Sequence, residues 1–315
     1  MGSQIGGIAA GLGAGFVAAR LLWVLMRTML LAPVFRRTNY RDHELSTAGG
    51  LIIVCAVLLV EMFRVLLGAI GIGEPLAAGG LRLPTLFGVI GFGLLGLVDD
   101  LGATGTSRGF KGHIRSILRG RLSTGAVKLV GGAMVALVVA AQLSSPGGPG
   151  FHSNLENVSS LSTLSARASN VGWLLLDAAL LALSANLGNL FDRAPGRTIK
   201  VSTLCFGVLA VGAVVVGNWL SLAPVAVAIG AGLGLLIDDL REHTMLGDTG
   251  SNVLGVVVAL GFIASASTGV RLVVLAAVVA LNAVSELVSF SRVIERTPPL
   301  RAADRAGAPH RRGAS

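Results

Sequence analysis

Nine apolar stretches, each close to the length that a helix needs to cross a membrane, constrain this chain more than any other feature. A spanning helix takes roughly 20 mostly apolar residues. Lipid offers the backbone no hydrogen-bond partners, so stretches of this length predict helices. Hydrophobic residues make up 53% of the chain and charged residues 13%, which is typical of an integral membrane protein. The stretches run approximately over 4–26, 48–72, 84–101, 124–143, 171–190, 201–217, 220–238, 251–268 and 272–291. We therefore expect an all-α, polytopic membrane protein.

The loop charges predict an orientation. Nearly all loop arginines and lysines follow the odd-numbered stretches, whereas the opposite loops carry only Arg82, Arg167 and Arg271. The positive-inside rule then places the N-terminus outside and the C-terminus in the cytoplasm of a multi-pass inner (cytoplasmic) membrane protein. The formal charge of +9 does not predict nucleic-acid binding, because such proteins carry basic stripes on a soluble face. Cys55 and Cys205 lie inside apolar stretches and indicate no disulfide framework.

Acidic residues gather on the same side as the basic ones. The positive-inside rule gives acidic residues little weight, so topology does not explain their placement. A divalent cation such as Mg²⁺, which takes one or two carboxylates and bridges phosphates, would explain it. The alternative is that each carboxylate caps a helix end or pairs with an arginine. Seven of the 16 acidic residues lie at these span ends: Asp99, Asp100, Asp192, Asp238, Asp239, Glu242 and Asp248.

Four segments at the cytoplasmic span ends carry a resemblance to a known family. They are STAGGLIIV (46–54), GLVDDLG (96–102) with the KGH and TGAVK that follow, NLGNLFDRAPGR (186–197) and MLGDTGSNVLG (245–255). In this order they resemble the polyprenyl-phosphate N-acetylhexosamine-1-phosphate transferases, which include phospho-N-acetylmuramoyl-pentapeptide transferase. The resemblance covers roughly residues 46–291.

The resemblance implies an enzyme that transfers a sugar 1-phosphate from a UDP-sugar to a polyprenyl phosphate. The products are UMP and a lipid pyrophosphate-linked sugar for cell-wall or surface-glycan synthesis, and the implied cofactor is Mg²⁺. Phosphoryl transfer needs mainly positioning and charge neutralisation, and the cytoplasmic loops contain both acidic and basic groups. Residues 1–291 would form one catalytic transmembrane domain and 292–315 a basic cytoplasmic tail.

The resemblance also implies roles for the acidic residues. Asp248 matches the metal-binding aspartate of the family, although it could instead cap the stretch 251–268. Asp99 and Asp100 match an aspartate pair assigned to the lipid phosphate and the metal. A lipid phosphate is already largely ionised near neutral pH, so we favour orientation and metal coordination, with Asp100 and Asp248 as metal ligands. Adjacent helical residues point about 100° apart, so only one of the pair faces a given site squarely.

Nucleotide-sugar and phosphate contacts are expected from polar and basic residues. Asn186, Asn189 and Asp192 match an Asn-x-x-Asn-x-x-Asp pattern that lines the nucleotide-sugar site, unless they form only a polar helix end. Lys128 is the favoured basic residue of the catalytic set, which also holds Asp99, Asp100 and Asp192, because a lysine just inside a span is costly without a role. A basic cluster between the third and fourth stretches could bind the pyrophosphate, although such clusters more often bind the anionic leaflet: Lys111, His113, Arg115, Arg119 and Arg121. Further candidates for phosphate or donor contacts are Arg193, Arg197, Lys200, Arg241 and His243.

The sequence also departs from the family pattern. Ala103 stands where the family often has lysine, Pro195-Gly196 where it usually has Asp-Gly, and Met245 where an aromatic residue can stack on uracil. We find no counterpart of the family's histidine-rich loop and tenth span after residue 291. We therefore expect a divergent, bacterial member with a donor other than the pentapeptide substrate.

Four charged residues are expected inside the membrane. Glu61 and Arg64 lie three residues apart on one helix face and should neutralise each other. Asp177 and Glu286 have no local partner and are candidates for contacts between helices or for a polar cavity. Two other function classes remain open at this point, an inactive membrane scaffold and a transporter of cations or anionic solutes. A homodimer is among the oligomeric states that the sequence leaves open.

Overall fold

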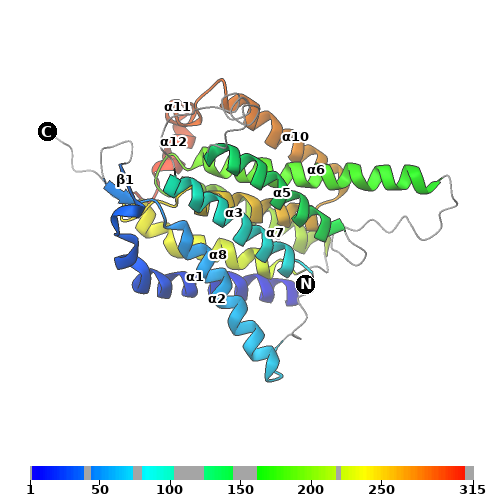
Figure 1. The fold of residues 1–315 in the computed structure, drawn as a ribbon, viewed down its shortest axis with the longest axis horizontal. Coiled ribbons are helices and arrows are strands. Elements are labelled where there is room, and N and C mark those ends of the chain that lie inside the picture. The colour runs from blue at the N-terminus through cyan, green and yellow to red at the C-terminus, as the bar shows by residue number, and fades with distance from the viewer. Residues whose placement is uncertain are drawn as a thin grey trace.

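The computed structural model describes residues 2–38, 44–73, 80–102, 124–144, 162–217 and 221–308. Over these residues the chain is an all-α bundle with one short 3₁₀ turn and one pair of short strands (Figure 1). The long helices are α1 (Gly2–Leu30), α2 (Gly50–Ala69), α3 (Arg82–Gly102), α5 (Thr124–Ser144), α6 (Ser162–Phe191), α7 (Arg197–Val216), α8 (Ala223–Leu240), α9 (Gly247–Ser265) and α10 (Thr268–Ser285). The shorter elements are η1 (Pro33–Phe35), β1 (Arg36–Thr38), β2 (Glu44–Ser46), α11 (Phe290–Arg296) and α12 (Pro298–Arg305).

Nine helices in the described part of the chain are long and apolar enough to span a membrane, which confirms the predicted multi-pass architecture. Several ends differ from the predicted ones. α9 begins at Gly247 rather than near 251, and α7 begins at Arg197 rather than near 201. Asp248 and Lys200 therefore lie in first helical turns instead of in loops. The predicted stretches missed these turns because their polar residues lower the local hydropathy.

Helices α8 and α9 form the centre of the bundle. About four fifths of each span is buried (78% and 83%), compared with a third or less for each of the other spans. α9 packs against α2, α3, α6, α7 and α8. The helix that carries the GDTGS segment is thus surrounded by other helices, so polar groups at its start are shielded from lipid.

A backbone contact joins two of the four family-like segments. β1 and β2 pair antiparallel with Arg36 opposite Ser46, and the chain then runs beside residues 245–246. Met245 N–H donates to Ser46 O (2.7 Å), and Gly50 N–H donates to Leu246 O (2.9 Å). A β-carbon on Gly50 would lie 2.0 Å from Gly250 N, so only glycine permits this approach of the two backbones.

Three of the four charged residues predicted inside the membrane are paired. Arg64 Nε donates to Glu61 Oε1 (2.6 Å), as predicted, and Arg82 lies 3.3 Å from the other Glu61 oxygen. Asp177 on α6 pairs with Arg271 on α10, which confirms its predicted contact between helices. The prediction for Glu286 was wrong, because α10 ends at Ser285 and the exposed Glu286 follows it.

Candidate functional site

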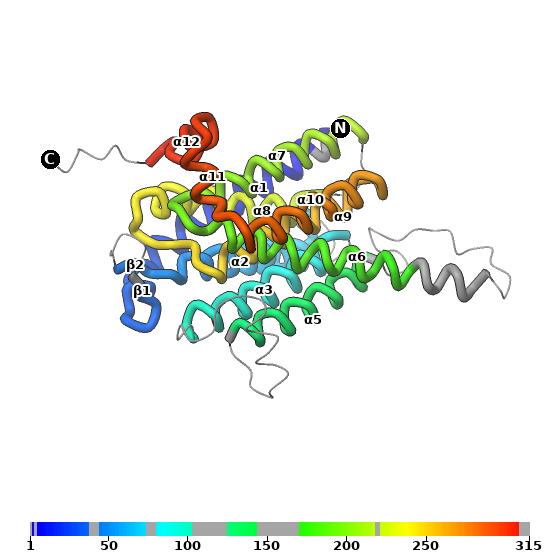
Figure 2. Tube along the Cα trace, turned by 90° about the horizontal axis from the view of Figure 1, so that it is seen from above, coloured from blue at the N-terminus to red at the C-terminus, as the bar shows by residue number. Residues whose placement is uncertain are grey.

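Those predicted site residues that the structure describes lie towards one end of the bundle. The ends of α3, α6 and α8 and the starts of α5, α7 and α9 meet there, beside the β1–β2 pair (Figure 2). Hydrogen bonds link these helix ends across large sequence separations: Lys128 on α5 binds carboxylates of α3 and α9, and Gly196 N–H before α7 donates to Asp239 of α8 (2.7 Å). The end of the bundle therefore forms one connected polar region.

Lys128 lies at the centre of this polar region and bridges two carboxylates. Its Nζ contacts Asp248 Oδ2 and lies 3.4 Å from Asp99 Oδ2. Both carboxyl groups therefore lie within ion-pairing distance of the same ammonium group. All three side chains are between 19% and 23% exposed. Two carboxylates that are close enough to share one ammonium group repel each other unless a cation lies between them. In this structure the Lys128 ammonium group supplies that positive charge.

Asp100 points to a different partner from Asp99. Its carboxylate accepts hydrogen bonds from Asp248 N–H (2.9 Å), Thr249 N–H (3.0 Å) and Thr249 Oγ1 (2.6 Å). Asp100 thus caps the start of α9 from another helix, where a negative charge is favourable. The alternative that Asp248 caps this helix was wrong. The N-cap position is Leu246, and the Asp248 side chain binds Lys128 instead.

Gly247 makes the turn into α9 possible. Its φ is +67°, and a β-carbon there would lie 1.9 Å from Thr47 O. An alanine would adopt the left-handed region at a cost of about 1–2 kcal/mol and would also collide with the backbone. We expect Gly247→Ala to lower the melting temperature in detergent, whereas the control Gly269→Ala, where a β-carbon meets open space, leaves it unchanged. Equal melting temperatures for the two variants would contradict this requirement.

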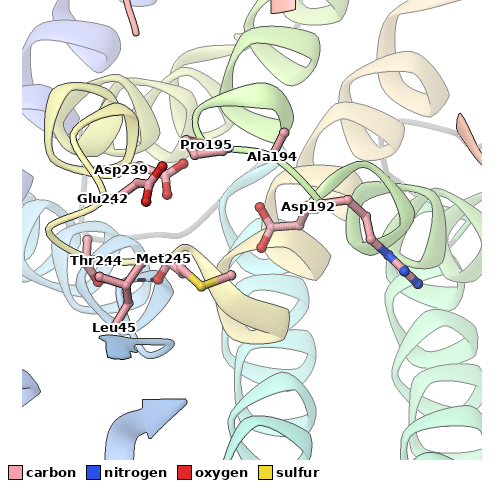
Figure 3. A pocket seen from close by; sticks show the side chains of 9 residues that line it. Leu45, Asp192, Ala194, Pro195, Asp239, Glu242, Thr244 and Met245 are labelled. Atoms are coloured by element: carbon pink, nitrogen blue, oxygen red, sulfur yellow. Dashed lines mark hydrogen bonds between the residues drawn. The ribbon is translucent and has the colours of Figure 1, made fainter. Parts of the chain in front are cut away.

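A small pocket lies beside the carboxylate cluster. Asp192 and the following turn form one wall, and the Asp192 carboxyl group faces the open space across from Asp239 and Glu242 (Figure 3). Burial raises the pKa of the Asp192 carboxyl group well above its ordinary range, and the charges of Asp239 and Asp248 raise it further. Thr198 Oγ1 donates to Asp192 (3.2 Å) and opposes the shift. The pocket residues are Leu45, Asp192, Arg193, Ala194, Pro195, Asp239, Glu242, Thr244 and Met245.

This pKa shift predicts a stabilising substitution. Because the folded protein holds the Asp192 proton more tightly than the unfolded chain, ionisation costs stability as the pH rises from about 4 through the raised pKa. Asparagine carries no charge but keeps an oxygen for Thr198. Asp192→Asn is expected to raise the melting temperature by about 2–4 °C near pH 8, in detergent without divalent cations. The gain should vanish near pH 4, and a lower melting temperature at pH 8 would contradict the prediction.

Other predicted site residues have partners outside the cluster of Lys128, Asp99 and Asp248. The Asn186 side chain donates to the Asn282 side chain of α10 (2.7 Å). Asn189 is half-buried, and its backbone carbonyl accepts a hydrogen bond from the Asp192 N–H. His243 lies 3.2 Å from Asp238, which also binds Arg20 of α1. Arg193 and Arg241 are exposed. Arg197 and Lys200 bind α12. The predicted residues outside the described part of the chain are Lys111, His113, Arg115, Arg119 and Arg121.

Several residues of this region were not predicted. Arg37 binds the Asp100 and Leu101 carbonyls (both 3.1 Å) and fixes the end of α3. Thr249 follows Asp248 inside the MLGDTGSNVLG segment, so its position was a usable signal, whereas Thr198 lies just after the NLGNLFDRAPGR segment and six residues from its partner Asp192. Asn252 is 1% exposed, and within the described part of the chain neither polar atom of its side chain has a hydrogen-bond partner. It lies one turn after Asp248, and unpaired polar atoms at such depth are typical of places that hold water or a ligand.

The donor atoms fit a magnesium ion. Mg²⁺ prefers carboxylate oxygens, usually takes one or two from the protein and completes its shell with water and phosphate. Asp99 and Asp248 offer this set. Asp100, which the sequence suggested as a ligand together with Asp248, already accepts three hydrogen bonds from the start of α9, so Asp99 is the better second ligand. Among the described residues no group of three or more His, Cys, Asp or Glu side chains forms a metal cage. The set therefore suits a metal that is shared with a phosphate substrate.

No protein-family model and no curated protein matches the chain. Function is therefore inferred from the residues and their geometry. Acidic groups that can share a cation, with a lysine between them and a pocket beside them, suit chemistry on a phosphate group.

Proposed function

We propose that this protein is a magnesium-dependent sugar-1-phosphate transferase that uses a polyprenyl phosphate acceptor and a UDP-sugar donor. It would be a divergent member of the family that its motifs resemble, acting at the cytoplasmic face of the inner membrane in the synthesis of an envelope glycan. The observation that carries the proposal is the contact of Lys128 with Asp99 and Asp248. Three helices bring these residues together from two of the four family-like segments, Asp99 and Lys128 from the second and Asp248 from the fourth.

The reaction forms one P–O bond and breaks another. An oxygen of the lipid phosphate attacks the phosphorus that carries the sugar, the bond between the two donor phosphates breaks, and UMP leaves with the electron pair. Asp99 and Asp248 would hold magnesium, which neutralises phosphate charge when bound. The Lys128 ammonium group would then be free to bind a phosphate oxygen. The attacking phosphate is largely ionised near neutral pH, so no strong general base is required.

The donor is proposed to bind on the Asp192 side. The pocket between Asp192 and Asp239 lies next to the carboxylates that would hold the metal, and its wall from Asp192 to Pro195 belongs to the segment that resembles the nucleotide-sugar motif. Arg193 borders this pocket and is exposed, so it is the basic side chain best placed for a donor phosphate. His243 interacts with Asp238 instead, which favours a structural role for it.

The direct test is formation of the lipid product. Purified protein in detergent is incubated with Mg²⁺, a polyprenyl phosphate and a panel of UDP-sugars, and the lipid fraction is analysed by mass spectrometry. We expect one donor to give a sugar-pyrophosphate-lipid, and omission of Mg²⁺ or of the acceptor to abolish it. A folded protein that forms no product with any donor would favour the scaffold alternative.

A further inference from the structure

The two C-terminal helices return to the candidate site after the last span. α11 and α12 lie at the same end of the bundle as the start of α7 (Figures 1 and 2). Arg197 Nε donates to Asp304 Oδ1 (2.7 Å) and Arg197 Nη2 donates to Asp304 Oδ2 (2.9 Å). The third guanidinium nitrogen donates to Ser291 Oγ on α11 (2.9 Å). One buried arginine thus binds both helices.

Further contacts attach the helix pair on both sides of the α6–α7 turn. Lys200 Nζ donates to the carbonyls of Asp304 (2.6 Å) and Ala303 (3.3 Å), where a cation is favourable at the end of α12. Phe290 stacks on Phe191 with ring centroids 5.2 Å apart. Phe191 precedes the turn, and Arg197 and Lys200 follow it.

The turn between these attachment points is the wall of the pocket. Residues Asp192 to Pro195 line it, and Gly196 N–H donates to Asp239 on the opposite wall. The Arg197 and Asp304 side chains are only 7% and 15% exposed. A two-pronged guanidinium–carboxylate contact fixes both distance and angle, and removing one partner leaves the other charge buried without compensation. The Arg197–Asp304 ion pair therefore fixes the turn on the side of α12, and Asp239 binds it from the opposite wall of the pocket.

We infer that Asp304 is a positioning residue for the donor pocket: through Arg197 it fixes the turn that carries Asp192. The identity of the pocket's ligand as a UDP-sugar rests on the proposed function. The role of Asp304 in fixing the turn does not rest on the proposed function, because it follows from the contacts alone. Arg197, which the sequence suggested as a donor contact, instead connects the C-terminal helices to the pocket wall.

The kinetic test compares Asp304→Asn with Glu295→Gln. Glu295 forms an exposed ion pair with Arg305 on the same two helices (side chains 55% and 65% exposed), so its variant controls for a general loosening of α11 and α12. Asp304→Asn is expected to raise the donor KM about tenfold, with kcat within about twofold and the acceptor KM unchanged, as loss of about 1.4 kcal/mol of binding would give. Asp304→Glu should recover most of the donor affinity. Unchanged kinetics, or an equal loss in Glu295→Gln, would overturn the inference.

A second measurement does not depend on activity. Hydrogen–deuterium exchange followed by mass spectrometry should show faster exchange over residues 192–200 in Asp304→Asn than in wild type or Glu295→Gln. Unchanged exchange there would overturn the positioning role even if the enzyme is active. Faster exchange in a protein that turns over no donor would support the role and refute only the proposed function. Should Asp304→Asn not fold, Arg197→Lys, which keeps the charge but loses the fork, is expected to show the same changes to a smaller degree.

Discussion

Replacing Asp248 by asparagine is expected to lower the rate of lipid-linked product formation by about a hundred- to a thousandfold, the usual cost of losing one group that stabilises transition-state charge. The asparagine side chain has nearly the same shape but carries no charge for a metal. Asp248 is one of the two carboxylates that pair with Lys128, so the variant also removes negative charge that the Lys128 ammonium group balances. Initial rates at saturating donor and acceptor measure the effect.

A matched control separates charge chemistry from folding. Glu44 lies at the same end of the molecule, and its side chain is 70% exposed beside Arg36. Glu44→Gln makes the same change of charge outside the carboxylate cluster and should retain the wild-type rate. Asp248→Asn should keep its melting temperature, because Asp100 rather than Asp248 caps α9. An Asp248→Asn variant with the wild-type rate would contradict a metal site at Asp248.

Breaking the ion pair between α6 and α10 is expected to have the largest effect on stability. Arg271 Nη1 lies 3.2 Å from Asp177 Oδ2, and the two side chains are 5% and 4% exposed within the spans. Arg271→Met leaves the carboxylate buried without a cation, which costs about 3–5 kcal/mol. The arginine also lies over the Trp173 ring at 5.7 Å. We expect a much lower melting temperature in detergent and a smaller folded fraction in the membrane.

A double variant identifies the cause. Asp177→Leu combined with Arg271→Met removes both charges, and well-packed apolar pairs often replace buried ion pairs without loss. The double variant should therefore recover most of the stability that Arg271→Met loses. If the two substitutions instead add to a larger loss, packing rather than charge compensation accounts for the role of the pair.

The sequence was sufficient for the nine spans but not for the ends nearest the site. The length of the apolar stretches decides which segments cross a membrane, because the backbone has no other partner there. The first turn of α9 was missed because Asp248 and Thr249 make it look like a loop. It is helical because Asp100, on another helix, accepts the free N–H groups of that turn. Such a cap between helices leaves no trace in local hydropathy.

The candidate site was predictable to the extent that its residues lie in motifs. Asp99, Lys128 and Asp248 were each chosen from a segment, and the structure brings all three into contact. The different directions of Asp99 and Asp100 follow from the 100° between adjacent helical residues. The contact of Arg197 with Asp304 joins residues 107 positions apart. No periodicity or motif marks that contact, so only the fold could reveal it.

The central claim is most directly tested by measuring UMP release with and without polyprenyl phosphate. Purified wild-type protein in detergent receives Mg²⁺ and each UDP-sugar in turn, and free UMP is quantified. We expect one donor to release UMP only when both the lipid phosphate and Mg²⁺ are present, in amounts equal to the lipid-linked sugar formed. UMP release that does not depend on polyprenyl phosphate would contradict the proposed transferase activity. So would the absence of release from any donor by a folded protein that binds polyprenyl phosphate.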